Sequence, residues 1–78
     1  MKIHVFASLK EYMPVQFELS NDTIATVQQL QLLLQEKYPA ASEVLAACRF
    51  SSEHEIVSFD QEIKNYDNIF VIPPSSGG

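Results

Sequence analysis

The chain has 78 residues, of which 46% are hydrophobic and 19% are charged, which fits one small globular domain and leaves no room for a second. Ten acidic and five basic residues give a formal net charge of −5, which argues against a nucleic-acid partner because phosphate contacts need clustered lysine and arginine. The single cysteine excludes an internal disulfide, and no apolar run reaches the roughly 18 residues that a membrane span needs. We therefore expect a cytoplasmic protein whose partners are proteins, with no nucleic acid and no membrane among them.

Two segments of alternating hydrophobicity near the start of the chain predict an antiparallel hairpin. In residues 2–8 the side expected to face the core carries Ile3, Val5 and Ala7, and the other side carries Lys2, His4, Phe6 and Ser8. In residues 15–19 the inward positions are Val15, Phe17 and Leu19. A turn or loop over residues 10–14 is expected to join the two strands.

The clearest helix is predicted over residues 26–38. Thr26 followed by Gln29 fits a capping box, and Pro39 cannot continue the helix. At helical spacing, one apolar stripe that should face the core is formed by Val27, Leu30, Leu33, Leu34 and Tyr38. Leu32 lies off this stripe, so we expect it to be half exposed.

The remaining elements are shorter: a helical turn at 40–45, a strand at 47–51, a brief strand at 56–57, a single helical turn at 60–63 and a strand at 69–72. The last is a continuous apolar run, which is typical of a central strand. Together these elements predict an α+β fold of the β-grasp, ubiquitin-like kind, with one main helix packed on a four- to five-stranded mixed sheet and the last strand beside the first. Residues 1–72 form this domain, and residues 73–78 form an extended, flexible tail.

The tail has the sequence Pro-Pro-Ser-Ser-Gly-Gly and contains both glycines of the chain, whereas a chain of this length ordinarily carries about five. The prolines favour a stiff, extended backbone, and the glycines lack a Cβ, so another protein can approach them closely. Such a segment suits a narrow channel in a partner enzyme, the alternative being a frayed terminus. The residues expected to bind that partner are Pro73, Pro74, Ser75, Ser76 and Gly77.

The reactive group of this tail is then the α-carboxylate of Gly78. A carboxylate is a poor acyl donor until a better leaving group replaces its oxygen, and adenylation by ATP supplies one. The chain has no glycine-rich phosphate loop. We therefore expect no cofactor bound by this chain, with ATP used by a partner activating enzyme.

Other candidate groups have simpler structural explanations. Cys48 lies in an apolar stretch without a second cysteine, so we expect a buried thiol and no nucleophile. His4 and His54 are far apart in the sequence and have no acidic cluster beside them, so we expect surface histidines and no metal site. Glu53 and Glu55 are of the type that performs acid–base chemistry in pairs, but in an acidic chain a solvated turn is the simpler interpretation.

An apolar patch is expected on the sheet face opposite the helix. If the first and last strands are neighbours, the alternation of side chains brings Phe6, Phe70 and Ile72 together there. Such a patch often marks a partner site. The alternative is additional core covered by residues 40–68.

Over its whole length the chain resembles the small subunits of molybdopterin synthase, which are ubiquitin-like sulfur carriers. The resemblance rests on Met1-Lys2-Ile3-His4-Val5, on Phe6-Ala7-Ser8-Leu9-Lys10-Glu11, on Thr26-Val27-Gln28-Gln29-Leu30 and on Ile69-Phe70-Val71-Ile72-Pro73-Pro74-Ser75-Ser76-Gly77-Gly78. The Pro-Pro-x-Ser-Gly-Gly ending is its most specific element.

The resemblance implies that an adenylating enzyme of the ubiquitin-activating type and a sulfurtransferase convert the Gly78 carboxylate to a thiocarboxylate. It implies further that the tail enters the large subunit of molybdopterin synthase, in a heterotetramer, and gives its sulfur to cyclic pyranopterin monophosphate during molybdenum cofactor biosynthesis. The catalytic side chains for this transfer belong to the large subunit. Two alternatives stay open, a sulfur carrier of thiamine synthesis and a protein modifier attached to lysines through Gly78.

Overall fold

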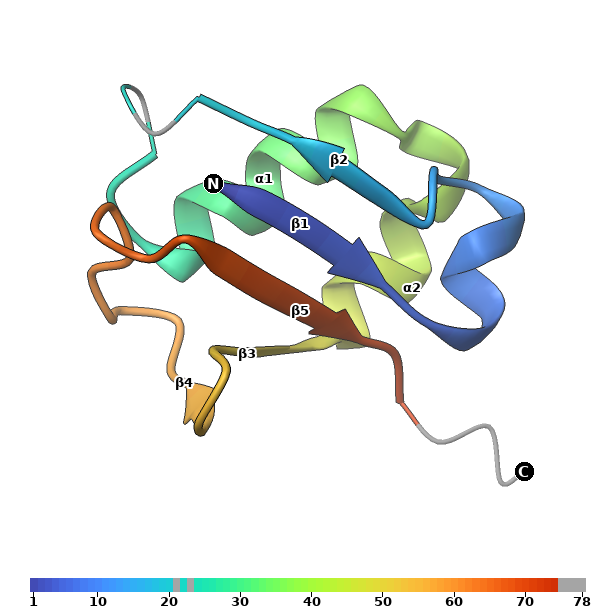
Figure 1. The fold of residues 1–78 in the computed structure, drawn as a ribbon. Helices are drawn as coiled ribbons and strands as arrows, with labels where there is room; N and C mark the ends of the chain where they lie inside the picture. The colour runs from blue at the N-terminus through green and yellow to red at the C-terminus, as the bar shows by residue number, and fades with distance from the viewer. Residues whose placement is uncertain (21, 23, 75–78) are drawn as a thin grey trace.

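The computed structural model describes residues 1–20, 22 and 24–74. Its five-stranded sheet has the order β2-β1-β5-β3-β4, with strands β1 (Lys2–Val5), β2 (Gln16–Glu18), β3 (Arg49–Ser51), β4 (Ile56–Val57) and β5 (Asn68–Ile72). β1 pairs with β5 in parallel and the other pairs are antiparallel, so the sheet is mixed. The helices α1 (Val27–Lys37) and α2 (Ser42–Ala47) lie on one face of this sheet (Figure 1). No helix in the described ranges is long and apolar enough to cross a membrane.

The predicted α+β, β-grasp architecture is confirmed, including the last strand beside the first. One main helix and a helical turn at 40–45 were expected, and that region forms the 3-10 turn η2 (Pro39–Ala41) followed by a second, shorter helix, α2. Two glutamine side chains of α1 hold α2 in place: Gln31 Nε2 donates to the Leu45 carbonyl at 2.9 Å, and Gln35 Nε2 donates to the Ser42 carbonyl at 3.0 Å. These contacts fix the position of α2 beside α1.

The first hairpin is confirmed, but its strands are shorter than predicted. Ile3 lies opposite Phe17 in the ladder, and the chain leaves the sheet after Val5 to form the 3-10 helix η1 (Ala7–Glu11). Ala7 begins that helix with a φ of +53° and is exposed, so its expected burial in the strand was wrong. The burial predicted for Val15 was also wrong, because this side chain lies at the outer edge of the sheet and is 57% exposed.

The predicted capping box begins α1. Thr26 Oγ1 accepts a hydrogen bond from the Gln29 amide at 3.3 Å, and Gln29 Oε1 accepts one from the Ala25 amide at 2.7 Å. The inner face of the helix buries Val27, Leu30 and Leu34 completely. Leu33 and Tyr38 are only half-buried against this core, and Leu32 is 54% exposed.

The segment between β4 and β5 is a loop, and the helical turn predicted at 60–63 is absent. Its carbonyl groups accept hydrogen bonds from the first turn of α1: the Gln28 amide donates to Phe59 O at 3.0 Å and the Val27 amide to Gln61 O at 3.3 Å. The Ile63 amide donates to Ala25 O at 2.8 Å. The loop therefore satisfies helix N–H groups that have no partner within the helix, and it buries Ile63 fully.

Cys48 is buried at the end of α2, as the sequence predicts. The thiol donates a hydrogen bond to the Val44 carbonyl at 3.1 Å, and burial raises the pKa of Cys48 to about 11. A thiol with so high a pKa carries little thiolate near neutral pH, and the thiolate is the nucleophilic form.

Two leucines on the same helix allow a direct test of the packing. We expect Leu30→Ala to lower the free energy of unfolding by about 2–5 kcal/mol, because it empties a fully buried site. The exposed Leu32 provides the matched control, and Leu32→Ala should cost about 0.5 kcal/mol or less. Urea unfolding of both variants measures the difference, and equal losses would contradict the position of α1.

The buried thiol predicts slow alkylation of the folded chain. The rise from 9.0 to about 11 in the pKa of Cys48 lowers the thiolate fraction near pH 8 about 100-fold. Iodoacetamide should therefore modify the native protein at least that much more slowly than the urea-unfolded protein, as followed by intact mass. Similar rates in the two states would mean that Cys48 is accessible in the fold.

Candidate functional site

β5 leads directly into the predicted tail at one end of the sheet (Figure 1). Pro73 is half-buried and Pro74 is exposed. The other predicted tail residues, Ser75, Ser76, Gly77 and Gly78, lie outside the described residues. The structure therefore locates the base of the tail, at the C-terminal end of a central strand.

The register of the central strands brings the predicted apolar residues together. Val5 pairs with Val71 and His4 with Phe70 along the parallel ladder, and successive side chains point to opposite faces. Ile3, Val5, Ile69 and Val71 face the helices and are buried. The opposite, open face of the sheet carries the other set, and the Phe6 and Phe70 rings lie 6.1 Å apart between centroids.

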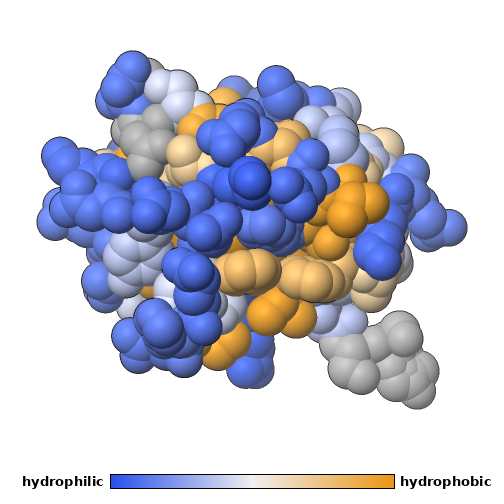
Figure 2. Space-filling model, viewed as in Figure 1, coloured by the Kyte–Doolittle hydropathy of each residue, from blue (hydrophilic) through white to orange (hydrophobic). Residues whose placement is uncertain are grey.

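These side chains remain at the surface. Phe6 is 41% exposed, Ile72 is 37% exposed and Phe70 is half-buried, so residues 40–68 do not cover them as additional core. Figure 2 shows hydrophobic surface over β5 toward its C-terminal end, surrounded mostly by hydrophilic surface. We call the group formed by His4, Phe6, Phe70 and Ile72 the docking surface.

His4 belongs to this surface, although its role was not foreseen beyond that of a surface histidine. Its ring stacks on Phe70 with 4.6 Å between centroids and 17° between planes. Its Nε2 lies 2.9 Å from Oδ1 of Asn68, at the start of β5. The signal for this position was the alternation in residues 2–8, which places His4 on the same side as Phe6, but its partners Asn68 and Phe70 come from the last strand, Asn68 from 64 residues away.

Charged residues surround the docking surface without entering it. Lys2 and Glu18 are opposite each other on β1 and β2, and a Glu18 carboxylate oxygen lies 3.6 Å from the N-terminal ammonium. Arg49 pairs with Ile72 across β3 and β5 and is exposed. An apolar centre with a polar rim is the usual composition of a protein–protein contact.

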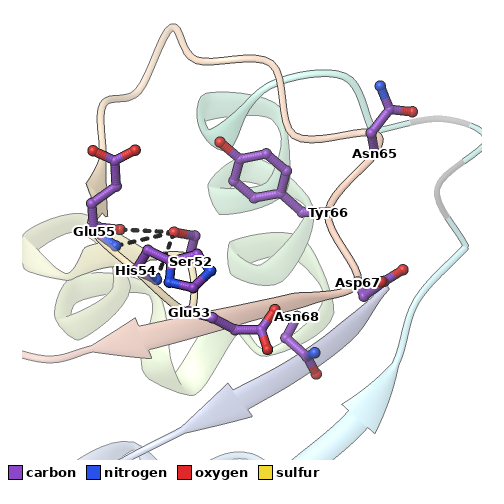
Figure 3. Close-up of a pocket in the computed structure, with 8 residues that line it drawn as sticks. All are labelled: Ser52, Glu53, His54, Glu55, Asn65, Tyr66, Asp67 and Asn68. Carbon is purple, nitrogen blue, oxygen red and sulfur yellow. Dashed lines mark hydrogen bonds between the residues drawn. The ribbon is translucent and has the colours of Figure 1, made fainter.

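A polar hollow of about 280 Å³ lies at the other end of β5, where the strand begins. Figure 3 shows its lining, which comprises Ser52, Glu53, His54, Glu55, Asn65, Tyr66, Asp67 and Asn68. The Ser52 hydroxyl accepts hydrogen bonds from the His54 and Glu55 amides, both at 3.1 Å, and so serves the turn itself. The Glu53 and Glu55 side chains point in different directions (Figure 3), which fits the expected solvated turn. Among residues 1–20, 22 and 24–74 no group of three or more His, Cys, Asp or Glu side chains could hold a metal ion.

Comparison with known proteins gives the family of the chain. The crystal structure of SAMP1 from Haloferax volcanii is similar, with a TM-score of 0.70 and 24% sequence identity over 99% of this chain and 97% of that one. No curated protein matches the sequence significantly. The ThiS family matches residues 3–78, from the first strand through the glycine pair. The chain therefore belongs to the ThiS family of ubiquitin-like β-grasp sulfur carriers.

Proposed function

We propose that this sulfur carrier is the small subunit of molybdopterin synthase and that Gly78 is its working residue. The observation that supports this role best is the Pro-Pro-Ser-Ser-Gly-Gly ending at residues 73–78, which follows an exposed apolar surface at the end of β5. In this role the chain is a protein substrate of its partners.

The chemistry begins at the Gly78 carboxylate. One carboxylate oxygen attacks the α-phosphate of ATP in an adenylating enzyme of the ubiquitin-activating type, and pyrophosphate leaves. The terminal sulfur of a persulfide on a sulfurtransferase then attacks the acyl carbon and AMP leaves, and a thiol reductant cleaves the resulting acyl disulfide to release the thiocarboxylate. In the large subunit of molybdopterin synthase this sulfur passes to cyclic pyranopterin monophosphate, and two charged carriers complete the dithiolene.

The body of the protein has to hold the tail at its partners. A partner that takes residues 75–78 into its active site must also lie close to Ile72, Pro73 and Pro74. The docking surface begins at that point and continues across β5 to Phe6. We therefore propose that the adenylating enzyme covers the docking surface and that the large subunit uses the same surface in the next step.

Two alternatives use the same terminus. A sulfur carrier for thiamine synthesis would receive the same thiocarboxylate but pass it to a different acceptor, and a protein modifier would form amide bonds to lysines. The stiff Pro73-Pro74 step favours the molybdopterin role over the thiamine role, since the thiamine carriers usually lack it. Incubation of the charged chain with the large subunit and cyclic pyranopterin monophosphate tests the molybdopterin role, because neither alternative passes sulfur to that acceptor.

Intact mass tests the terminal chemistry. With the adenylating enzyme, ATP and a sulfur donor, the chain should gain about 16 Da, because sulfur replaces one carboxylate oxygen. Adding one alanine after Gly78 should abolish this gain while leaving the fold intact. A ladder of lysine conjugates, or an unchanged rate of thiocarboxylate formation in the extended chain, would contradict the proposal.

Phe70→Glu tests the docking surface. A carboxylate in the centre of an apolar contact should weaken binding to the adenylating enzyme by at least about tenfold. Leu32→Glu is the matched control, because it places the same charge at an exposed apolar position of α1, on the helix side of the sheet. If Phe70→Glu remained folded and bound as tightly as the control, the partner would dock elsewhere.

A further inference from the structure

The docking surface contains one ionisable side chain, His4, in the middle of its apolar residues. We propose that His4 is a specificity determinant of this surface: its Nδ1 accepts a hydrogen bond from an N–H or O–H group of the adenylating enzyme, and protonation of the ring removes that contact. This inference rests on the proposed function, because it assumes that the adenylating enzyme covers this face. It adds that the adenylating enzyme must offer a hydrogen-bond donor to His4 and that the affinity of the complex must fall with the pH.

The contacts of the imidazole define which nitrogen is left for a partner. Nε2 lies 2.9 Å from Oδ1 of Asn68. A carboxamide oxygen can only accept a hydrogen bond, so Nε2 carries the hydrogen, and in the neutral ring Nδ1 is an acceptor. Within the described part of the chain, Nδ1 has no hydrogen-bond partner. The Asn68 contact is the same in the neutral and the protonated ring, so protonation changes only Nδ1, which turns from a hydrogen-bond acceptor into a donor.

Stacking fixes where Nδ1 lies. The ring is held parallel to Phe70 at 4.6 Å and tied to Asn68 at its other nitrogen, so two neighbours on β5 determine its orientation. A partner that packs on Phe70 and Phe6 must therefore also meet His4. If that partner brings only apolar atoms, it leaves a polar nitrogen desolvated and unpaired, which is unfavourable.

The groups that face His4 from the neighbouring strands are neutral. They are Gln16, opposite it on β2, and Asn68 and Phe70 on β5. The charged side chains of β1 and β2 on this face are Lys2 and Glu18, which lie opposite each other, and a Glu18 oxygen lies 3.6 Å from the N-terminal ammonium. Arg49, beyond β5, adds positive charge on the same face. No carboxylate is thus directly opposite His4 in the described sheet to stabilise an imidazolium when water is excluded.

The sign of the pH dependence follows from this environment. Docking places His4 under an apolar contact where the charged form is disfavoured, and the partner's donor repels a protonated Nδ1–H. The complex therefore requires the neutral ring. Binding should therefore weaken as the pH falls and the ring takes up a proton.

The test compares variants on the same purified adenylating enzyme, so that the enzyme's own titrations cancel. His4→Gln keeps a polar side chain that does not titrate, and His4→Phe keeps the stacked ring but removes the acceptor. His54→Gln is the matched control, because His54 is an exposed histidine of the turn between β3 and β4 and is not one of the docking-surface residues. Dissociation constants are measured by titration calorimetry at about pH 7.5 and about pH 5.5, and thermal melts verify that each variant is folded.

We expect the wild type and His54→Gln to lose roughly tenfold more affinity than His4→Gln between the two pH values. At the higher pH, His4→Phe should bind roughly fivefold or more weakly than the wild type, because the enzyme's donor is then unpaired. Equal pH dependence in the wild type and His4→Gln, tighter binding of the wild type at low pH, or undiminished binding of His4→Phe would each overturn the inference.

Binding of the Phe70→Glu variant shows whether a negative result concerns only the role of His4 or the proposed function itself. If Phe70→Glu abolishes binding while the His4 variants behave like the wild type, the docking surface stands and the role of His4 is wrong. If Phe70→Glu binds normally, or the wild type forms no complex with the enzyme, the proposed docking is wrong and the inference falls with it.

Discussion

The parallel pairing of β1 with β5 is the contact on which the rest of this structure depends. It joins the first and last strands at the centre of the sheet, with Ile3 beside Ile69 and Val5 beside Val71. Because side chains alternate across a strand, the same ladder produces two different surfaces. One side forms the buried core under the helices, and the other brings His4 against Phe70. A change of register by one residue would exchange these two faces and destroy both the core and the docking surface.

The helical layer depends on the long loop between β4 and β5. Carbonyl groups of Phe59 and Gln61 accept hydrogen bonds from the first turn of α1, and Ile63 is fully buried beside that turn. The loop thus caps the helix from a distant part of the sequence, in addition to the local cap formed by Thr26.

The polar pair formed by His4 and Asn68 affects the choice of partner differently from the apolar residues around it. Phe6, Phe70 and Ile72 favour any partner with a complementary apolar surface, whereas His4 and Asn68 favour only a partner that satisfies the hydrogen bonds they leave open. Sulfur carriers of one fold must be recognised by the correct enzymes. The proposed contact of His4 would penalise the wrong partner in this way and would also make binding sensitive to pH.

The sequence by itself determined the elements that depend on local patterns. The alternation around Ile3 and Val5, the Thr26–Gln29 capping box, the apolar stripe of α1 and the continuous run in residues 69–72 all follow from neighbouring residues, and each predicted the observed element. The family resemblance also rests on the sequence alone, in four segments over the whole chain of which the ending at residues 73–78 is the most specific, and the ThiS family match over residues 3–78 agrees with it at the level of the family. The exposed patch was also predictable, because it needed only alternation and the placement of the last strand beside the first.

Tertiary structure alone decided the features that depend on distant partners. The positive φ of Ala7 and the exposure of Val15 follow from where the chain leaves the sheet, which alternation does not reveal. Residues 60–63 form a loop because their backbone groups bond to the segment that begins α1, and local propensity carries no information about that neighbour. The contact of His4 with Asn68 spans 64 residues, so its place in the docking surface became visible only once β1 and β5 were paired.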